Sequence, residues 1–388
     1  FYNSGCPATF SKNRSLTFSG NTSGAEGGAI HAGGTCPLRF ETNGSLVFLN
    51  NQAKKGGAIR ASVLTILNTT SPLEFSGNKA TNGDGGAILM AEDNYEAGLY
   101  IGQHGSVIFS GNSASKSGGA IYIEDTATFL SDNQSLLFSE NSAGMDGGAI
   151  ATGSSCRTLN FNNNQQLLFQ NNTATKNGGA ICVKSLSIAG NGTVAFTNNN
   201  AGTSGGAISA QSVSIVNNES VEFRGNYVKQ YDENGNLTGT VLNSVHAGDL
   251  ELSTQAEGGT ITFYDPITNV STGSLDLNYY KDSDGNDVTG AGDIVFSGLH
   301  AEEDLTAVFR TLGLGTTGET FQSCLETSLT STIRASNKDE GVTLHGGTLR
   351  VSDDAILKIA NSSYSGGNYL AKNGTLTELS NGGSLNID

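Results

Sequence analysis

The sequence predicts an all-β fold, a right-handed parallel β-helix (solenoid) with three strands per coil and roughly a dozen coils over about 55 to 65 Å. Three observations lead to this prediction. The tetrapeptide Gly-Gly-Ala-Ile recurs at nearly constant spacing, Phe-x-x-Asn precedes each copy, and short apolar blocks alternate with polar turns without a helical period.

Gly-Gly-Ala-Ile occurs seven times, at intervals of 29, 29, 33, 29, 31 and 27 residues. Such spacing is typical of solenoids, in which one unit buries its apolar faces only against its neighbours. The copies are Gly27, Gly28, Ala29 and Ile30; Gly56, Gly57, Ala58 and Ile59; Gly85, Gly86, Ala87 and Ile88; Gly118, Gly119, Ala120 and Ile121; Gly147, Gly148, Ala149 and Ile150; Gly178, Gly179, Ala180 and Ile181; Gly205, Gly206, Ala207 and Ile208.

Phe-x-x-Asn stands eight to ten residues before each of these copies, and one more copy follows without a partner. We expect the Phe rings to stack inside the helix, one per coil, and the Asn amides to form a hydrogen-bonded ladder at the next turn, where Asn tolerates left-handed backbone. The pairs are Phe18 and Asn21, Phe48 and Asn51, Phe75 and Asn78, Phe109 and Asn112, Phe138 and Asn141, Phe169 and Asn172, Phe196 and Asn199, and Phe223 and Asn226.

Within one repeat we expect strands at 45–49, 57–61 and 63–67, with polar turns between them. Alternation places the Ile of each motif inward and the residue after it on the surface. The two glycines mark a close approach of backbone. Extra Phe-x-x-Asn spacings at Phe10, Phe40 and Phe161 suggest that the preceding turn is sometimes built in the same way. The positions predicted to be exposed are His31, Arg60, Leu89, Tyr122, Ala151, Cys182 and Ser209.

Three regions are expected along the chain. Residues 1–226 form the repeat β-helix, residues 227–250 form an inserted loop, and residues 251–388 continue as an irregular β-helix. Strand-like blocks resume at 259–264, 292–296, 341–344, 347–351 and 355–359. A second insertion lies near 300–330, where 301–312 has the composition of a short helix.

Composition narrows the function. The formal net charge of -16 argues against nucleic acid as a partner, because its phosphates would repel this surface. No apolar stretch approaches the length of a membrane-spanning helix. The chain begins at Phe1 without Met and has no signal peptide, so we expect it to be a piece of a longer precursor.

The repeated GGA[ILV] and FxxN motifs resemble those of the chlamydial polymorphic membrane proteins, which are autotransporters. The segments 257–267 and 292–298 resemble the middle region of that family. The resemblance implies a passenger segment on the bacterial surface, attached to the outer membrane through a C-terminal β-barrel that we expect to lie outside this chain. It further implies that the motif copies above serve adhesion to a receptor protein on the host cell.

An enzyme remains an alternative, because parallel β-helices also host polysaccharide-cleaving enzymes, but we expect none here. Asp353 and Asp354 are adjacent and cannot both face one side of a strand, so a turn is the better interpretation. His345 is isolated. Asp282, Asp284, Asn286 and Asp287 have oxygen ligands at a spacing that suits a weak calcium loop, although a solvated acidic turn is favoured. No cofactor is expected.

The five cysteines leave at least one thiol outside any intrachain pair. Cys6 and Cys36 stand in the same relation to the Phe residues that follow them, so they occupy equivalent places in adjacent coils. Stacked coils would bring their Cα atoms to about 4.8 Å, within the disulfide range. Two stacked free thiols are the alternative. Cys182 is expected on the surface, where it is able to link chains, and nothing assigns Cys156 or Cys324.

Three functions are compatible with these features. The first is a surface adhesin that binds a host-cell receptor, with contacts summed over many coils. The second is a structural spacer or self-associating passenger that joins related chains through open coil ends. The third is a β-helix enzyme acting on polysaccharide. The sequence leaves open whether FxxN and GGAI contact the receptor or only build the fold.

Overall fold

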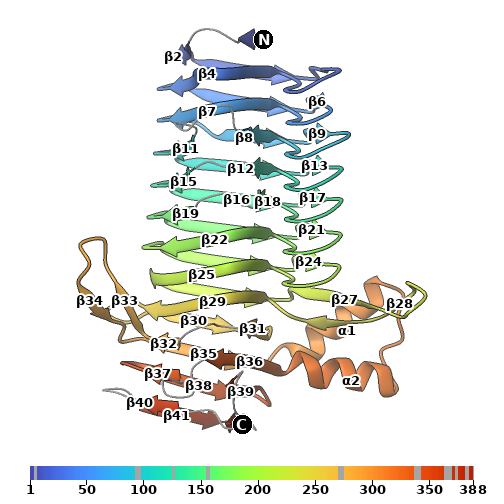
Figure 1. Ribbon diagram of the computed structural model, residues 1–388, viewed down its shortest axis with the longest axis vertical. Coiled ribbons are helices and arrows are strands. Elements are labelled where there is room, and N and C mark those ends of the chain that lie inside the picture. Colours follow the sequence, from blue (N-terminus) through green and yellow to red (C-terminus); the bar gives the residue numbers. More distant parts are fainter. Residues whose placement is uncertain are drawn as a thin grey trace. The chain divides into compact units, whose positions relative to one another are not determined.

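The computed structural model describes residues 1–3, 7–91, 98–124, 127–153, 158–269, 275–335, 342–361, 369–371, 375–380 and 384–387. The chain divides into two compact units, Phe1–Ser187 (unit 1) and Ile188–Asp388 (unit 2). Each unit is a parallel β-solenoid with three sheets, as the repeat predicts (Figure 1). The hand of the coil stays a prediction.

The first sheet of unit 1 carries the FxxN phenylalanines. Its neighbouring strands pair in parallel with Phe opposite Phe, for example Phe109 opposite Phe75 and Phe138. This register places the apolar alternate residues of every coil on the same inner face. The strands are β3 (Ser15–Ser19), β5 (Ser45–Leu49), β8 (Leu73–Ser76), β12 (Ser106–Ser110), β16 (Ser135–Ser139) and β20 (Gln166–Gln170).

The second sheet of unit 1 consists of two-residue strands that follow the Asn of each motif, and the sequence did not predict them. Each places an Ala in the core. These strands are β6 (Gln52–Ala53), β9 (Lys79–Ala80), β13 (Ser113–Ala114), β17 (Ser142–Ala143) and β21 (Thr173–Ala174).

The third sheet of unit 1 begins at the Ile of each GGAI. The two strands predicted after that motif both lie in this sheet, and in some coils they are continuous, as in β7. Its strands are β1 (Tyr2–Asn3), β2 (Ala8–Ser11), β4 (Ile30–Glu41), β7 (Ile59–Leu67), β10 (Ile88–Met90), β11 (Gly98–Gly102), β14 (Ile121–Ile123), β15 (Ala127–Ser131), β18 (Ile150–Thr152), β19 (Leu159–Asn162) and β22 (Ile181–Ala189).

Unit 2 repeats the first and third sheets, and its strands include the blocks predicted in the C-terminal half. The first sheet contains β23 (Thr193–Thr197), β26 (Ser220–Arg224), β30 (Thr260–Phe263), β35 (Asp293–Ser297), β38 (Thr348–Ser352) and β41 (Thr375–Ser380). The third sheet contains β25 (Ile208–Asn218), β29 (Val245–Thr254), β31 (Ile267–Asn269), β32 (Leu275–Leu277), β36 (Thr330–Ala335), β37 (Val342–Leu344), β39 (Ile356–Asn361), β40 (Tyr369–Ala371) and β42 (Ser384–Ile387).

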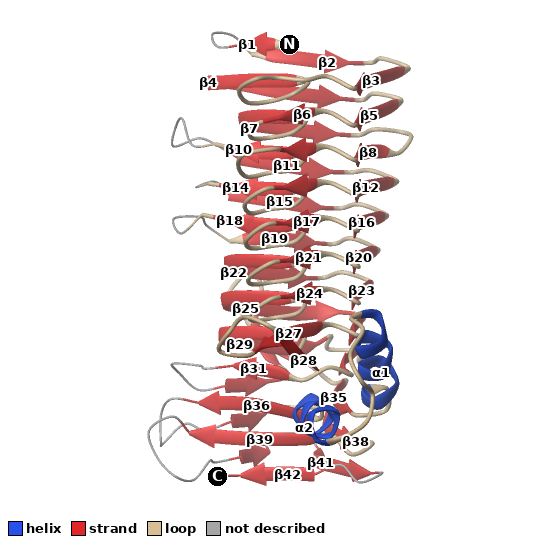
Figure 2. Cartoon of the chain, turned by 90° about the vertical axis from the view of Figure 1, so that its right-hand side faces the viewer, coloured by secondary structure: helices blue, strands red, loops and turns tan. Residues whose placement is uncertain are grey.

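The second sheet of unit 2 is short and ends differently. β24 (Asn200–Ala201) pairs in parallel with β27 (Tyr227–Tyr231), which turns back into the antiparallel β28 (Leu237–Leu242). The helix expected at 301–312 is present as α1 (Ala301–Thr311), and a second helix, α2 (Glu319–Ser328), follows it. Both helices contact β28 (Figure 2). A second hairpin, β33 (Tyr279–Lys281) and β34 (Asp287–Thr289), also leaves the coils.

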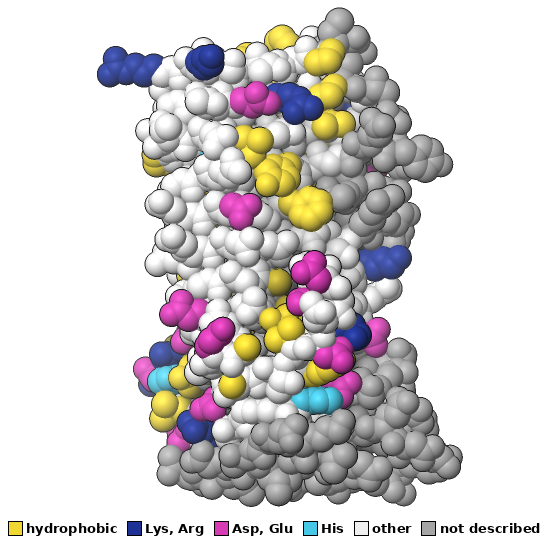
Figure 3. All heavy atoms as spheres, turned by 90° about the vertical axis from the view of Figure 1, so that its left-hand side faces the viewer, with side chains coloured by type: hydrophobic (Ala, Val, Ile, Leu, Met, Phe, Trp, Pro, Cys, Tyr) yellow, Lys and Arg dark blue, Asp and Glu magenta, His cyan; other side chains and the backbone are white. Residues whose placement is uncertain are grey.

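One face of the molecule carries few charged side chains among its described residues. In the face shown in Figure 3, neutral polar side chains and backbone cover most of the surface, and charged side chains are scattered between them. This agrees with a charged fraction of 14%. The described part of this face therefore offers mainly hydrogen-bonding groups rather than ion-pairing groups.

Candidate functional site

The FxxN phenylalanines form an aromatic stack inside each unit, as predicted. In unit 1 consecutive ring centroids lie 4.6 to 4.9 Å apart, and the ring planes are within 2 to 6° of parallel. In unit 2 the stack from Phe196 to Phe296 has spacings of 4.9 to 5.2 Å. From Phe48 onward these rings are buried. The Phe of the motif is therefore a core residue.

The Asn of the motif forms the predicted ladder, and Asn112 represents it. Its Oδ1 accepts hydrogen bonds of 3.0 Å from both the backbone N–H and the Nδ2 of Asn78. Its own Nδ2 donates to Asn141 Oδ1 at 3.0 Å and to the Phe75 carbonyl at 2.9 Å. Every polar atom of a fully buried carboxamide thus has a partner, which removes the cost of burying it. The residues at 0% exposure in this position are Asn51, Asn78, Asn112, Asn141, Asn172, Asn199 and Asn226.

The left-handed residue at this turn is not the motif Asn, as the sequence suggested, but the residue before it. Gly111 has φ 59° and Glu140 has φ 56°. The motif Asn is not among the residues with positive φ, and its N–H donates to the Asn of the next coil, as Asn112 does to Asn141 Oδ1 at 3.0 Å, so the reversal falls one residue earlier. The residues at this position are Gly20, Asn50, Gly77, Gly111, Glu140, Asn171, Asn198 and Gly225.

A second polar ladder lies at the corner before the first sheet, where the extra Phe-x-x-Asn spacings predicted it. Asn13 donates to Asn43 at 3.0 Å, and Asn133 donates to Asn164 at 2.9 Å. His104 occupies this corner in one coil and is 2% exposed.

His104 is held as a neutral ring. Its Nε2 lies 3.1 Å from the Ile66 carbonyl, which only accepts, so Nδ1 accepts from the Thr69 N–H at 3.1 Å. Burial disfavours the charged ring and lowers the pKa of His104 to about 4.

The second glycine of GGAI lies where no side chain fits in the five copies from Gly28 to Gly148 and in the copy at Gly206. A Cβ built on Gly119 would be 1.9 Å from the carbonyl oxygen of Gly148 in the next coil. The first glycine has a left-handed backbone, with φ 67° at Gly118. The predicted close approach of backbone is confirmed. GGAI is therefore a turn that lets adjacent coils stack at strand spacing.

The residue after each GGAI isoleucine was predicted to be exposed, and this prediction is wrong for several coils. Arg60, Leu89 and Ala151 are 7%, 4% and 1% exposed. The glycine turn of the neighbouring coil covers this position, since a Cβ on Gly56 would lie 3.0 Å from Leu89 Cβ. Alternation alone predicts the inner face but does not account for what folds over the outer one.

Among the cysteines, only the predicted exposure of Cys182 is corrected by the structure. Cys6, the side chain of Cys36, and Cys156 lie outside the described residues, so the predicted bond stays a prediction. Cys182 is half-buried, not exposed, and burial together with the nearby Asp146 charge raises the pKa of its thiol to about 12. A thiol that stays protonated is a poor nucleophile, which argues against the predicted link between chains through Cys182.

The weak calcium candidate lies in the turn of the β33–β34 hairpin. Asp282 Oδ1 accepts from the backbone N–H of Asp284 and Asn286, and Oδ2 accepts from Asn286 Nδ2. Asp287 accepts from Tyr279 and Lys281. The β27–β28 hairpin has the same turn, in which Asp232 accepts from Asn234 and Asn236. The Asp at the start of each turn thus stabilises the loop by accepting hydrogen bonds from residues of the same turn.

Helix α2 seals the free edge of β28. The backbone N–H of Thr240 bonds to the Cys324 thiol, and that of Leu242 donates to Ser328 Oγ at 2.9 Å. Cys324 and Ser328 are four residues apart, so they lie on one face of the helix. Leu305, Phe309 and Phe321 pack beside them. Two edge donors that would otherwise attract another strand are therefore occupied.

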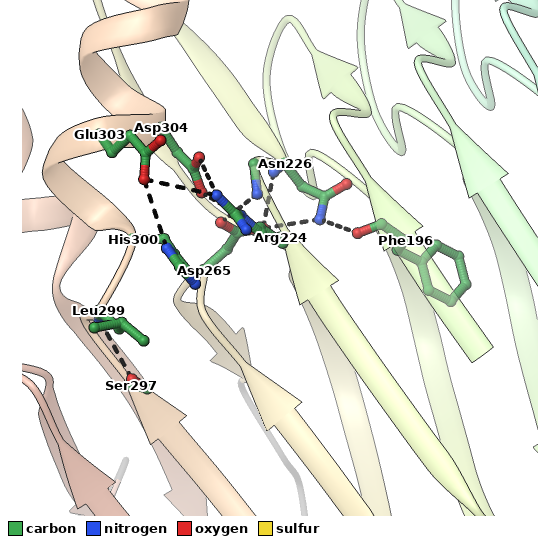
Figure 4. Close-up of polar contacts among 10 residues, drawn as sticks. Phe196, Arg224, Asn226, Asp265, Ser297, Leu299, His300, Glu303 and Asp304 are labelled. Atoms are coloured by element: carbon green, nitrogen blue, oxygen red, sulfur yellow. Dashed lines mark hydrogen bonds and ion pairs between the residues drawn. The ribbon is translucent and has the colours of Figure 1, made fainter. Parts of the chain in front are cut away.

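A polar cluster ties helix α1 to the solenoid of unit 2 (Figure 4). Arg224 Nε donates to Asp304 Oδ2 at 3.2 Å, and Glu303 lies 3.8 Å from the same guanidinium. The first turn of α1 is acidic, which suits the positive end of its dipole. The Asp304 carboxylate raises the pKa of Arg224 above its ordinary value.

Asp265 ends the Asn ladder of unit 2. Its Oδ2 accepts from the N–H and the Nδ2 of Asn226, each at 2.8 Å, and its Oδ1 accepts from the Gly225 N–H at 2.9 Å. Complete burial raises the pKa of Asp265 to about 7, against the opposing effect of those donors. A carboxylate accepts hydrogen bonds as the Asn Oδ1 does, but it has no side-chain N–H with which to donate to a further coil.

The remaining sequence candidates occupy surface turns. Asp353 and Asp354 both have left-handed φ, 54° and 61°, which confirms the predicted turn. His345 Nε2 lies 2.7 Å from Asp276 Oδ1. Within the described residues no group of three or more His, Cys, Asp or Glu is arranged to hold a metal ion. No helix in the described part of the chain is long and apolar enough to cross a membrane.

Sequence reasoning missed α2, Arg224 and Asp265. The spacing of Phe321, Cys324 and Ser328 is helical and was a usable signal for α2. Asp265 follows Phe263 by two residues instead of three, so the motif search passed over it.

Comparison with known proteins identifies the repeats. The Chlamydia polymorphic membrane protein (Chlamydia_PMP) repeat matches residues 15–33, 45–62, 72–90, 106–124, 135–153, 166–184 and 193–211. The chain is 35% identical over 153 residues to the probable outer membrane protein pmp6 of Chlamydia pneumoniae, covering 29% of this chain and 12% of the relative. It is 31% identical over 135 residues to the probable outer membrane protein PmpG of Chlamydia muridarum, covering 28% and 14%. The aligned parts are small fractions of those relatives. No solved structure matches.

Proposed function

We propose that this chain, which carries seven chlamydial polymorphic membrane protein repeats, is part of a surface-displayed adhesin of an autotransporter that binds a protein receptor on host cells. Its cell-surface location is part of the proposal and is supported by the two relatives named probable outer membrane proteins. The repeats form the scaffold, and the contact lies in segments that leave the coils.

The observation that carries this assignment of roles is the burial of the motifs. From Asn51 to Asn226 each FxxN Asn is 0% exposed, and the Phe beside it is equally enclosed. A receptor has no access to such side chains in the folded chain. Adhesion associated with FxxN therefore depends on them indirectly, because they hold the coils that display the contact surface.

The β27–β28 hairpin is the segment that best suits a contact. Tyr231 is 51% exposed at its tip, and the Asp232 turn fixes the loop beside it. A rigid turn that displays an exposed Tyr loses little conformational entropy on binding, and Tyr is enriched in binding surfaces. The hairpin lies within the predicted insertion 227–250.

The direct test compares adhesion of coated beads to human epithelial cells for wild type and Tyr231→Ser. Removing all of 227–250 would be uninformative, since it takes away the buried Val228, Leu242 and Val245. Tyr2→Ser is the matched control, because Tyr2 is 71% exposed in unit 1.

We expect Tyr231→Ser beads to bind at least about tenfold less than wild type, and Tyr2→Ser beads to bind normally, since truncating one central aromatic contact costs on the order of 2 kcal/mol. Circular dichroism checks that both variants fold. If wild-type beads leave the cells bare, the adhesin proposal fails and the spacer alternative takes its place.

A further inference from the structure

A pocket in unit 2 remains unexplained by the proposed receptor contact. It has a volume of about 310 Å³ and lies where β28 and α2 meet β29, β31 and the start of β36. Figure 2 shows β28, β31, β36 and α2 below β27, and β29 at about the level of β27. This volume is at the lower end for small-ligand sites and suits a single sugar ring.

The pocket wall is neutral. Its lining contains no Asp, Glu, Lys or Arg, although the chain as a whole has a net charge of -16. The polar groups are hydroxyls, the Asn243 carboxamide and the His246 imidazole. A charged ligand would be buried there without a counter-charge, which is costly, so the lining selects an uncharged ligand.

The hydroxyls are divided between donors and acceptors. Thr327 Oγ1 donates to the Ser323 carbonyl and Thr330 Oγ1 donates to the Glu326 carbonyl, so their oxygen lone pairs remain for a ligand. Thr268 Oγ1 instead accepts from Asn243 at 3.4 Å and keeps its proton to donate. Ligand hydroxyls, which both donate and accept, match this mixture.

His246 adds one donor and one acceptor. None of the described residues hydrogen-bonds to its ring, and burial lowers its pKa below the ordinary value, which favours the neutral form. The pocket also has an apolar side, formed by Val228, Leu242 and Pro266. The C–H face of a sugar ring requires such a surface beside its hydroxyls.

We infer that this pocket binds a neutral sugar unit, a hexose or N-acetylhexosamine, of a glycan on the host surface. His246 and Thr268 hydrogen-bond to its hydroxyls, and Leu242 and Pro266 contact its ring. The inference goes beyond the protein contact proposed for Tyr231, and the two fail separately.

The test titrates the whole chain with the methyl glycosides of glucose, galactose, N-acetylglucosamine and N-acetylgalactosamine, using saturation-transfer NMR. N-acetylneuraminic acid serves as the charged comparison. The variants are His246→Ala and Thr268→Val. Thr332→Val is the matched control, because Thr332 pairs with Thr268 in the same sheet but lies outside the pocket lining.

We expect at least one neutral glycoside to bind wild type and the control equally, and to bind each pocket variant about five- to tenfold more weakly, as expected for one lost neutral hydrogen bond. Circular dichroism verifies folding. Absence of binding by all four glycosides, binding unchanged in both pocket variants, or a preference for N-acetylneuraminic acid would each overturn the inference. Adhesion of wild-type beads without glycoside binding leaves the receptor proposal intact. Glycoside binding without bead adhesion removes the receptor proposal and the host surface as the source of the glycan, and leaves only sugar binding by the pocket.

Discussion

Units 1 and 2 use the same coil but treat its second sheet and its Asn ladder differently. In unit 1 the short strands β6 to β21 pair in parallel, and the Nδ2 of each ladder Asn donates to the Oδ1 of the Asn in the next coil. In unit 2 the ladder stops at Asp265 and the second sheet stops at β28, beside α2. Regular repetition stabilises the solenoid, and the interruptions create surface features that differ from coil to coil.

The end of the ladder has a simple chemical cause. Asn both donates and accepts, so it transmits the pattern, whereas the Asp265 carboxylate only accepts. The chain then follows a different course through Pro266 into β31. A single change of side-chain type thus coincides with the place where hairpin and helices replace short strands.

The largest predicted effect is a loss of stability in a variant whose coils in unit 1 no longer stack closely. In Gly119→Ala the new methyl would meet the Gly148 carbonyl at 1.9 Å, so coils must separate, and we expect a loss of more than about 4 kcal/mol. Gly111→Ala is the control, because nothing lies within 4 Å of its Cβ and only its φ of 59° is unfavourable, at about 1 to 2 kcal/mol. Thermal unfolding measures both. Equal losses would contradict the close-approach explanation.

We next expect the stability of the two units to change in opposite directions with pH. His104 in unit 1 has a folded pKa of about 4, below its ordinary 6.5, so the unfolded chain takes up the proton first as pH falls. Unit 1 should therefore lose up to about 3 kcal/mol between pH 6.5 and 4. Asp265 in unit 2 has a folded pKa of about 7, above its ordinary 3.8, so unit 2 should lose stability as pH rises from 3.8 to 7.

Native-state hydrogen exchange resolves the two responses by reporting on the backbone amides of each unit separately. His104→Asn, which restores the residue found at the same corner in Asn133, should flatten the response of unit 1 alone. Asp265→Asn should flatten that of unit 2 alone. Parallel pH profiles in the two units would contradict the assignment to these residues.

The smallest predicted effect is a gain in stability. Thr128 points into the core of unit 1 between Leu99 and Leu159, and its buried Oγ1 has no hydrogen-bond partner among the described residues. Thr128→Val keeps the shape and removes the unpaired hydroxyl, so we expect a gain of about 1 kcal/mol. Thr65→Val, on the outer face of β7, should change the unfolding midpoint little. A loss of stability in Thr128→Val would show that the hydroxyl is bonded.

The sequence was sufficient for the parts of the fold that depend on repetition. Phe and Asn recur because one geometry is copied in each coil, so their spacing predicted both the stack and the ladder. The two-residue strands were missed because a pair such as Gln52 and Ala53 is too short to show alternation. The contact of α2 with the edge of β28 was missed because Cys324 and Ser328 bond to Thr240 and Leu242, which lie far away in the sequence.

The candidate site was less predictable than the fold. The motifs stood out in the sequence because they are repeated, yet repetition reflects the core, where every coil has the same task. The residues that we propose as contacts, Tyr231 and His246, each occur once, and a single residue carries no periodic signal. Their exposure and surroundings became visible only in three dimensions.

The most direct test of the account is bead adhesion by Asn112→Ala, corrected for the folded fraction at each temperature. The substitution removes a buried ladder residue and leaves the N–H and one of the two Nδ2 hydrogens of Asn78 without an acceptor, the other still donating to the Phe48 carbonyl, so it should destabilise unit 1 by about 3 kcal/mol. If the contact lies outside the repeats, adhesion per folded molecule equals that of wild type. Reduced adhesion by a fully folded variant would contradict the account, because the motif itself would then take part in the contact.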